Sequence, residues 1–119
     1  MSKKTEIPQS ALRFLNLMLA VHSLPSMPAL DGIEEKILNA LALQWGKGAK
    51  VTVMEMLQFF TNTSPSTVHR RLKSLKKKGM LALQEDEDDN RTKYILPTQL
   101  AIAYFEEIGK CMTMAARKI

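Results

Sequence analysis

The sequence predicts a mostly helical α+β fold in which a helix-turn-helix is followed by a β-hairpin and flanked by further helices. Three observations predict this fold. Capping boxes at 31–34 and 52–55 mark the starts of two helices. The segment 64–79 opens with Ser-Pro and closes with Gly, which is typical of a helix with an N-cap and a C-terminal stop. Beyond it, the apolar segments 80–83 and 92–96 enclose a polar loop and predict two strands.

The N-terminal part of the chain is predicted to hold a disordered tail over 1–9 and a flanking helix with its linker over 10–30. Ser10 is expected to cap this helix, which continues to about His22. Two prolines within 24–28 end it, because proline cannot continue a helix. The helix is apolar around most of its circumference, and a small domain rarely covers so wide an apolar surface by itself.

A central domain is predicted over 31–97. Within it, a short helix over about 53–60 precedes the helix that Ser64 begins, and Asn62 between them is expected to adopt a left-handed backbone conformation. The hairpin loop is expected to run from Gln84 to Arg91. The apolar side chains expected to face the core from these helices are Ile33, Ile37, Leu38, Leu41, Trp45, Val53, Met56, Leu57, Phe60, Val68, Leu72 and Leu75.

The C-terminal helix is predicted over 98–119 and carries apolar side chains on two sides. One stripe holds Leu100, Tyr104, Ile108, Cys111 and Ala115, and the second holds Ile102, Phe105 and Met112. One stripe can pack on the central domain, whereas the other would be exposed in a monomer, which predicts a homodimer formed through the terminal helices. The alternative is that the N-terminal helix covers the second stripe within one chain.

Composition excludes several classes of protein. The chain has 119 residues and a net charge of +5, which suits one compact domain with an anionic partner. No apolar run approaches the roughly 18 residues that a membrane span needs. The single Cys excludes an intramolecular disulfide and fits the cytoplasm, and a buried apolar role is expected for Cys111, with redox sensing as the alternative.

Metal-ligand spacings, phosphate-binding glycine loops and nucleophile motifs are missing from the sequence, so neither an enzyme nor a cofactor is expected. The eight Met are expected to fill the core, and the alternative is that they line an effector pocket, for which the sequence offers no support.

The segment 64–79 carries most of the functional information. Six of the ten residues over 69–78 are Lys or Arg and none is acidic, so no ion pair within the helix neutralises this face. The positive side chains lie opposite the apolar stripe of the same helix. Small hydroxyl residues at the start of the helix permit close approach to a phosphate. A basic second helix of a helix-turn-helix fits the major groove of DNA, and a merely solvated cationic face is the alternative.

From about Asp31 to Thr98 the chain resembles winged helix-turn-helix regulators of the multiple antibiotic resistance regulator (MarR) family. The run 66–70, together with Leu75 and 77–81, is similar to the recognition helix of that family and its exit into the first wing strand. Asp89-Asn90-Arg91, with Thr98 seven residues later, is similar to the family's wing signature. The resemblance implies a cytoplasmic transcriptional regulator that binds double-stranded DNA as a homodimer. Gln58 and Thr61 depart from related motifs, and so does the run of five acids over 85–89.

Two sets of contacts to DNA are expected on this basis. Those to base edges are assigned to Ser66, Thr67, Arg70 and Lys73. Those to the DNA backbone are assigned to Thr63, Ser64, Arg71, Lys76, Lys77, Arg91 and Lys93. The acids over 85–89 are expected either to keep the wing out of the minor groove or to form a solvated loop without a DNA contact. A winged-helix module that docks an acidic protein is the rival interpretation, and a replication or plasmid-maintenance protein would share the same sequence features.

Overall fold

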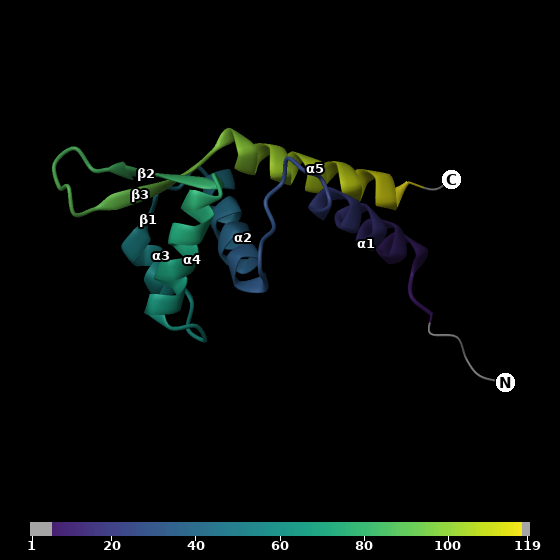
Figure 1. Cartoon of the computed structure of the whole chain (residues 1–119), viewed down its shortest axis with the longest axis horizontal. Coiled ribbons are helices and arrows are strands. Elements are labelled where there is room, and N and C mark those ends of the chain that lie inside the picture. The colour runs from purple at the N-terminus through teal and green to yellow at the C-terminus, as the bar shows by residue number, and fades with distance from the viewer. Residues whose placement is uncertain (1–5, 118–119) are drawn as a thin grey trace. The chain divides into compact units, whose positions relative to one another are not determined.

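The computed structural model describes residues 6–117, which contain five helices and three strands (Figure 1). Residues 1–5 of the predicted N-terminal tail, and 118–119 of the predicted C-terminal helix, lie outside the described part. Two compact units are present: a central unit, Leu30–Ile102, and a terminal unit made by the segments on either side of it. The elements are α1 (Gln9–His22), α2 (Gly32–Gly46), β1 (Val51–Thr52), α3 (Val53–Phe59), α4 (Pro65–Lys77), β2 (Leu81–Glu85), β3 (Lys93–Pro97) and α5 (Gln99–Ala116).

The central unit packs three helices against a small antiparallel sheet with strand order β1-β3-β2. Ile95 of β3 is the Cα partner of both Val51 and Leu83, so β3 lies in the middle. The hairpin of β2 and β3 projects away from the helices (Figure 1). The large apolar side chains that are fully buried in this core are Ile37, Leu38, Leu41, Val68, Leu75, Met80 and Ile95. The predicted α+β fold, with its order of helices and hairpin, is therefore confirmed.

Local sequence signals account for where the helices of the central unit begin and end. Asp31 accepts a hydrogen bond from the Glu34 backbone N–H at 2.7 Å, and the reciprocal bond completes the predicted capping box. Thr52 begins α3 with the second box. Ser64 caps α4 by accepting from the Thr67 backbone N–H. Gly79, two residues beyond the end of α4, has φ +81°, a conformation that costs glycine little.

Four local predictions are corrected. Helix α1 begins at Gln9 after Pro8, and no side chain caps it, so Ser10 is not its N-cap. Pro8, with φ −54°, already holds a helix-compatible φ, which lets the helix begin earlier. Asn62 does not adopt the left-handed conformation, since no described residue other than glycine has a positive φ.

The other two corrections concern strands. Strand β1 was not predicted, because two residues before a helix cap carry no strand periodicity. Strand β2 extends through Glu85, into the predicted loop, where Glu85 lies opposite Lys93 and the two unlike charges favour pairing.

Within the terminal unit, α1 and the part of α5 that belongs to this unit run antiparallel. The Arg13 guanidinium donates to the Ala115 carbonyl at 2.8 and 3.0 Å, near the end of α5. At the other end of α1, the His22 ring lies 3.4 Å from the Tyr104 hydroxyl. Helix α1 therefore lies along the first predicted stripe of α5, and Cys111 on that stripe is buried as predicted. The alternative in which α1 covers the second stripe is not what the structure shows, because Met112 of that stripe stays exposed.

None of the described helices is both long enough and apolar enough to cross a lipid bilayer.

Candidate nucleic-acid interface

Helix α4 separates an apolar face from a cationic one. Val68, Leu72 and Leu75 are buried in the core of the central unit, as the 3.6-residue period predicts. The opposite face is exposed and consists of Ser66, Arg70, Lys73 and Lys77, with His69 and Lys76 exposed on its flanks. The sequence therefore predicted correctly which face of α4 is buried and which is exposed.

The segment 69–78 contains six lysine and arginine side chains. Two of them form ion pairs with acids at the N-terminal end of α2. The Arg71 Nε lies 2.8 Å from the Asp31 carboxylate at the start of α2. The Lys78 Nζ donates to both carboxylate oxygens of Glu34, at 2.7 and 2.9 Å. Arg71, expected to contact the DNA backbone, and Lys78 thus tie α4 to the N-terminus of α2.

Glu34 is the buried centre of this contact and is 1% exposed. It also accepts from the Ser74 hydroxyl at 2.7 Å and from the Asp31 backbone N–H at 2.9 Å. Burial by itself would raise the pKa of Glu34, but the hydrogen bonds from Lys78, the Asp31 backbone and Ser74 outweigh it and lower the pKa below its ordinary value of 4.5. Glu34 is therefore a buried, charged carboxylate.

This role of Glu34 was not predicted, although the sequence carries a signal for it. The spacing from Glu34 to Ile37, Leu38 and Leu41 is that of one helical face, so Glu34 shares the buried stripe of α2. A glutamate on such a stripe predicts a buried cation nearby, because an unpaired buried charge is costly. The partner itself was not readable, since Lys78 lies 44 residues away.

The remaining cations of α4 stay available to a ligand. Lys73, Lys76 and Lys77 are exposed and form no ion pair with any residue over 6–117. Arg70 is exposed, and within residues 6–117 its side chain forms one hydrogen bond, to the Thr67 hydroxyl at 3.4 Å. This cationic face is next to the first turn of α4, where Ser64 and Ser66 are exposed and Thr63 and Thr67 are half-buried.

A small hollow separates α4 from the hairpin. It has a volume of about 200 Å³, an apolar lining from Val53, Leu72 and Leu83, and basic side chains around it. The basic side chains are those of Lys73, Lys76 and Lys93, with His69 beside them. The structure thus brings Lys93 of the hairpin to the same hollow as two lysines of α4, which their sequence separation did not reveal.

Two of the four acids in the hairpin loop order it; the fifth acid of the run, Glu85, belongs to β2. The Asp86 carboxylate accepts from the backbone N–H groups of Asp88 and Asp89. It also accepts from the Tyr94 hydroxyl at 3.0 Å. The bonds from the Asp88 N–H and from the Tyr94 hydroxyl hold the pKa of Asp86 below its ordinary value. The hydrogen bond to Asp86, together with the negative charge of that carboxylate, raises the pKa of Tyr94. Asp89 accepts from the Arg91 N–H and the Thr92 hydroxyl.

The other acids of the loop face solvent. Glu87 and Asp88 are exposed, and neither carboxylate forms an ion pair within the described residues. Arg91 beside them is almost fully exposed and lies 3.5 Å from Asp89. The tip of the hairpin therefore presents acids together with one arginine.

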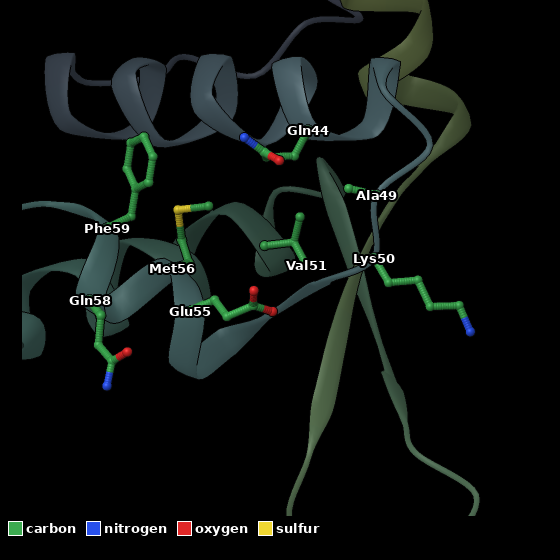
Figure 2. Close-up of a pocket in the computed structure, with 8 residues that line it drawn as sticks. All are labelled: Gln44, Ala49, Lys50, Val51, Glu55, Met56, Gln58 and Phe59. Atoms are coloured by element: carbon green, nitrogen blue, oxygen red, sulfur yellow. The ribbon is translucent and has the colours of Figure 1, made fainter.

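A second groove lies between α2 and α3 on the central unit (Figure 2). Its volume is about 350 Å³, and Figure 2 shows Gln44, Met56 and Phe59 directed into the space between the two helices. Its lining contains one acid, Glu55, and one base, Lys50, in addition to amides and apolar groups. This mixture defines no single class of ligand. No group of three or more His, Cys, Asp or Glu in the described part of the chain is arranged to hold a metal ion.

Comparisons with known proteins find a likeness in structure but not in sequence families. No protein-family model matches the sequence, and no curated protein matches it. Among solved structures, the chain is similar to YusO from Bacillus subtilis, with a TM-score of 0.56 and 20% identity over 88% of this chain and 66% of that one. It is also similar to a MepR variant from a multidrug-resistant S. aureus clinical isolate, with a TM-score of 0.61 and 17% identity over 88% of this chain and 68% of MepR.

A third similar structure is described as a MarR-like transcriptional regulator from Thermotoga maritima. Its TM-score is 0.58 at 19% identity, over 94% of this chain and 79% of the regulator. The chain has a MarR-like winged-helix fold. In the terms of this fold, α3 and α4 form the helix-turn-helix, and the β2–β3 hairpin is the wing. Helix α4 takes the position that the recognition helix has in helix-turn-helix proteins. The chain spans about two thirds of the length of YusO and MepR, and at these identities the likeness concerns the fold.

Proposed function

We propose that the protein is a cytoplasmic transcriptional regulator that binds double-stranded DNA as a homodimer and has no catalytic activity. The observation that carries this proposal is the exposed face of the recognition helix, where Arg70, Lys73, Lys76 and Lys77 have no acidic partner among the described residues. Such a face attracts a polyanion. The winged-helix fold presents this helix for insertion into the major groove, which is about 12 Å wide.

The positions of the side chains divide the contacts into two sets. The base edges would meet the first turns and outward face of the recognition helix, where Ser66, Arg70 and Lys73 are exposed and Thr67 is half-buried between them. Phosphates would meet the edges of this face and the wing, which hold Thr63, Ser64, Lys76, Lys77, Arg91 and Lys93. Arg71 belongs to the second set in our proposal, and its ion pair with Asp31 makes it the most constrained member. The lysines around the hollow between the recognition helix and the wing lie close together, and in our proposal they contact the phosphates of one DNA strand.

We expect Arg70 to discriminate between bases and Lys77 to contribute affinity only. Arg70→Ala should cost about 1–3 kcal/mol on the preferred site and relax the preference at one base pair, because arginine bidentate to guanine is the commonest specific contact. Lys77→Ala should weaken all duplexes about equally and reduce the salt slope by ~1 per protomer. Both side chains are exposed, so both variants are expected to fold.

The measurement is a titration of each variant with a duplex selected from a random pool and with single-base variants of that duplex. Circular dichroism of each variant controls for folding. The same loss of affinity on every duplex for both substitutions would show that Arg70 contacts only phosphate. Binding to an acidic protein but to no duplex would favour the rival protein-interaction module.

The homodimer is proposed to form through the terminal unit. Leu15 and Leu19 of α1 are 56% and 66% exposed, and Met112 of α5 is also exposed, although all three are apolar. Contiguous exposed apolar side chains commonly mark an interface. A two-fold dimer would also present two recognition helices to the two halves of a palindromic site.

We expect sedimentation equilibrium at micromolar concentration to show a dimer of the full chain. A Leu15→Glu/Leu19→Glu variant should be monomeric, because four buried charges would face one another across a two-fold interface. Leu43→Glu is the matched control, since Leu43 is 69% exposed on α2 of the central unit. A strictly monomeric wild-type protein would rule out the dimer.

A further inference from the structure

The first turns of the recognition helix contain a connected set of hydroxyl groups that ends at Arg70. The Ser64 hydroxyl accepts from the Thr67 backbone N–H at 3.2 Å and donates to the Thr67 hydroxyl at 2.9 Å. The Arg70 Nη2 donates to the same Thr67 Oγ1 at 3.4 Å. The three residues are spaced by three, which places their side chains in one row along the helix.

This row draws the Arg70 guanidinium back toward the start of the helix. Arginine is long and has about 2 kcal/mol of rotamer entropy, so an exposed arginine normally samples many positions. Within residues 6–117 no acid forms an ion pair with Arg70, so Thr67 is the side chain that restrains it. In helix-turn-helix proteins the N-terminal residues of the recognition helix contact base edges.

Thr67 itself is poorly placed to use its hydroxyl oxygen on DNA. It is half-buried, whereas Ser66 and Arg70 on either side of it are exposed. Its Oγ1 already accepts hydrogen bonds from Ser64 and Arg70, which occupy the two acceptor positions of a hydroxyl. The remaining capacity of Thr67 is one hydroxyl proton and a methyl group.

We propose that Thr67 is a positioning residue that restrains the Arg70 guanidinium for reading a base, with Ser64 holding Thr67 in turn. This proposal rests on the proposed function and assigns a role to one residue within it. Restraint before binding lowers the entropy that Arg70 loses on contacting a base, so it strengthens recognition of the preferred base without adding a contact. The class of ligand that such a fork recognises is the O6/N7 edge of guanine in duplex DNA.

A double-mutant cycle tests the proposal. Thr67→Val keeps the shape of the side chain and removes the hydroxyl, whereas Thr67→Ser keeps the hydroxyl. On a selected duplex, Thr67→Val should reduce the preference for the correct base pair at the Arg70 position by roughly 3- to 10-fold, the range expected for one hydrogen bond. Thr67→Ser should restore most of that preference. In the Arg70→Ala background, Thr67→Val should have no further effect, because its action passes through Arg70.

A second measurement does not require DNA. In the free protein, the NMR order parameter of the Arg70 Nε–H group should fall in Thr67→Val and should not fall in Thr67→Ser. Equal losses from Thr67→Val with and without Arg70 would overturn the proposal and show that Thr67 contacts DNA directly. An unchanged order parameter would also overturn it. If wild-type protein shows no salt-dependent duplex binding, the proposed function fails, and the role of Thr67 in base reading fails with it.

Discussion

The affinity of this protein for duplex DNA should fall by about 10³- to 10⁵-fold between 50 and 200 mM salt. A protein that contacts 6–10 phosphates releases a comparable number of condensed cations, and the slope of log K against log salt is about −0.9 per contact. In a dimer, each protomer would supply Lys76, Lys77, Arg91 and Lys93, with Lys73 in reach of either a base or a phosphate. These side chains are exposed, so on binding they would exchange solvent and counterions for phosphate at little structural cost.

Fluorescence anisotropy of a labelled duplex over this salt range measures the slope. Removing one phosphate contact by Lys76→Ala should make the slope shallower by ~1 unit per protomer. Lys36→Ala is the matched control, because Lys36 is also exposed but lies on α2. The control should leave the slope unchanged. A salt-independent affinity, or no binding at 50 mM salt, would contradict the proposed function.

Lys78→Ala should destabilise the central unit by about 3 kcal/mol, although Lys78 is not a core residue. Removing one partner of a buried ion pair costs about 3–5 kcal/mol, because the other charge remains buried. Glu34 keeps its bonds from Ser74 and the Asp31 backbone, which places the expected loss at the lower end of that range. Urea unfolding at fixed protein concentration measures the loss. Trp45, whose Nε1 donates to the Ile95 carbonyl, is the fluorescent reporter.

Two further variants separate charge from packing. Lys76→Ala is the control, because Lys76 is exposed, and it should change stability by no more than about 0.5 kcal/mol. In Glu34→Gln/Lys78→Met, neither charge remains buried, so the double variant should be more stable than Lys78→Ala. If Lys78→Ala and Lys76→Ala are equally stable, the Glu34 ion pair contributes nothing to folding.

The pH dependence of the same ion pair has a definite sign. The folded pKa of Glu34 lies below its ordinary value of 4.5, so its contribution to stability is complete above that pH. The contribution is lost as the pH falls through the lower folded pKa. In Lys78→Ala the largest of the interactions that lower this pKa is gone, so the pKa of Glu34 should be higher than in the wild type. The difference in stability between wild type and Lys78→Ala should therefore shrink as the pH falls, and urea unfolding at several pH values checks this.

The sequence by itself determined the helices of the central unit, the wing and the side of α4 on which the cations lie. The capping boxes at Asp31 and Thr52 and the Ser64 cap act within three residues, so they can be read without knowledge of the fold. The apolar period of α4 fixes which side is buried, and therefore which cations are exposed. The resemblance to MarR-like regulators agrees with the fold found by structural comparison. Errors occurred where the signal was weak, as at Ser10, Asn62 and strand β1.

Only the tertiary structure decided which charges are available. Six cations of the α4 segment look alike in the sequence, but Arg71 and Lys78 are paired with α2, and the other four are not paired with acids among the described residues. Likewise, Asp86 and Asp89 order the wing loop, whereas Glu87 and Asp88 face solvent. The physical reason is range. Helix caps and periodicity depend on neighbours within about four residues, whereas the partner of Glu34 lies 44 residues away and is brought to it only by packing of the core.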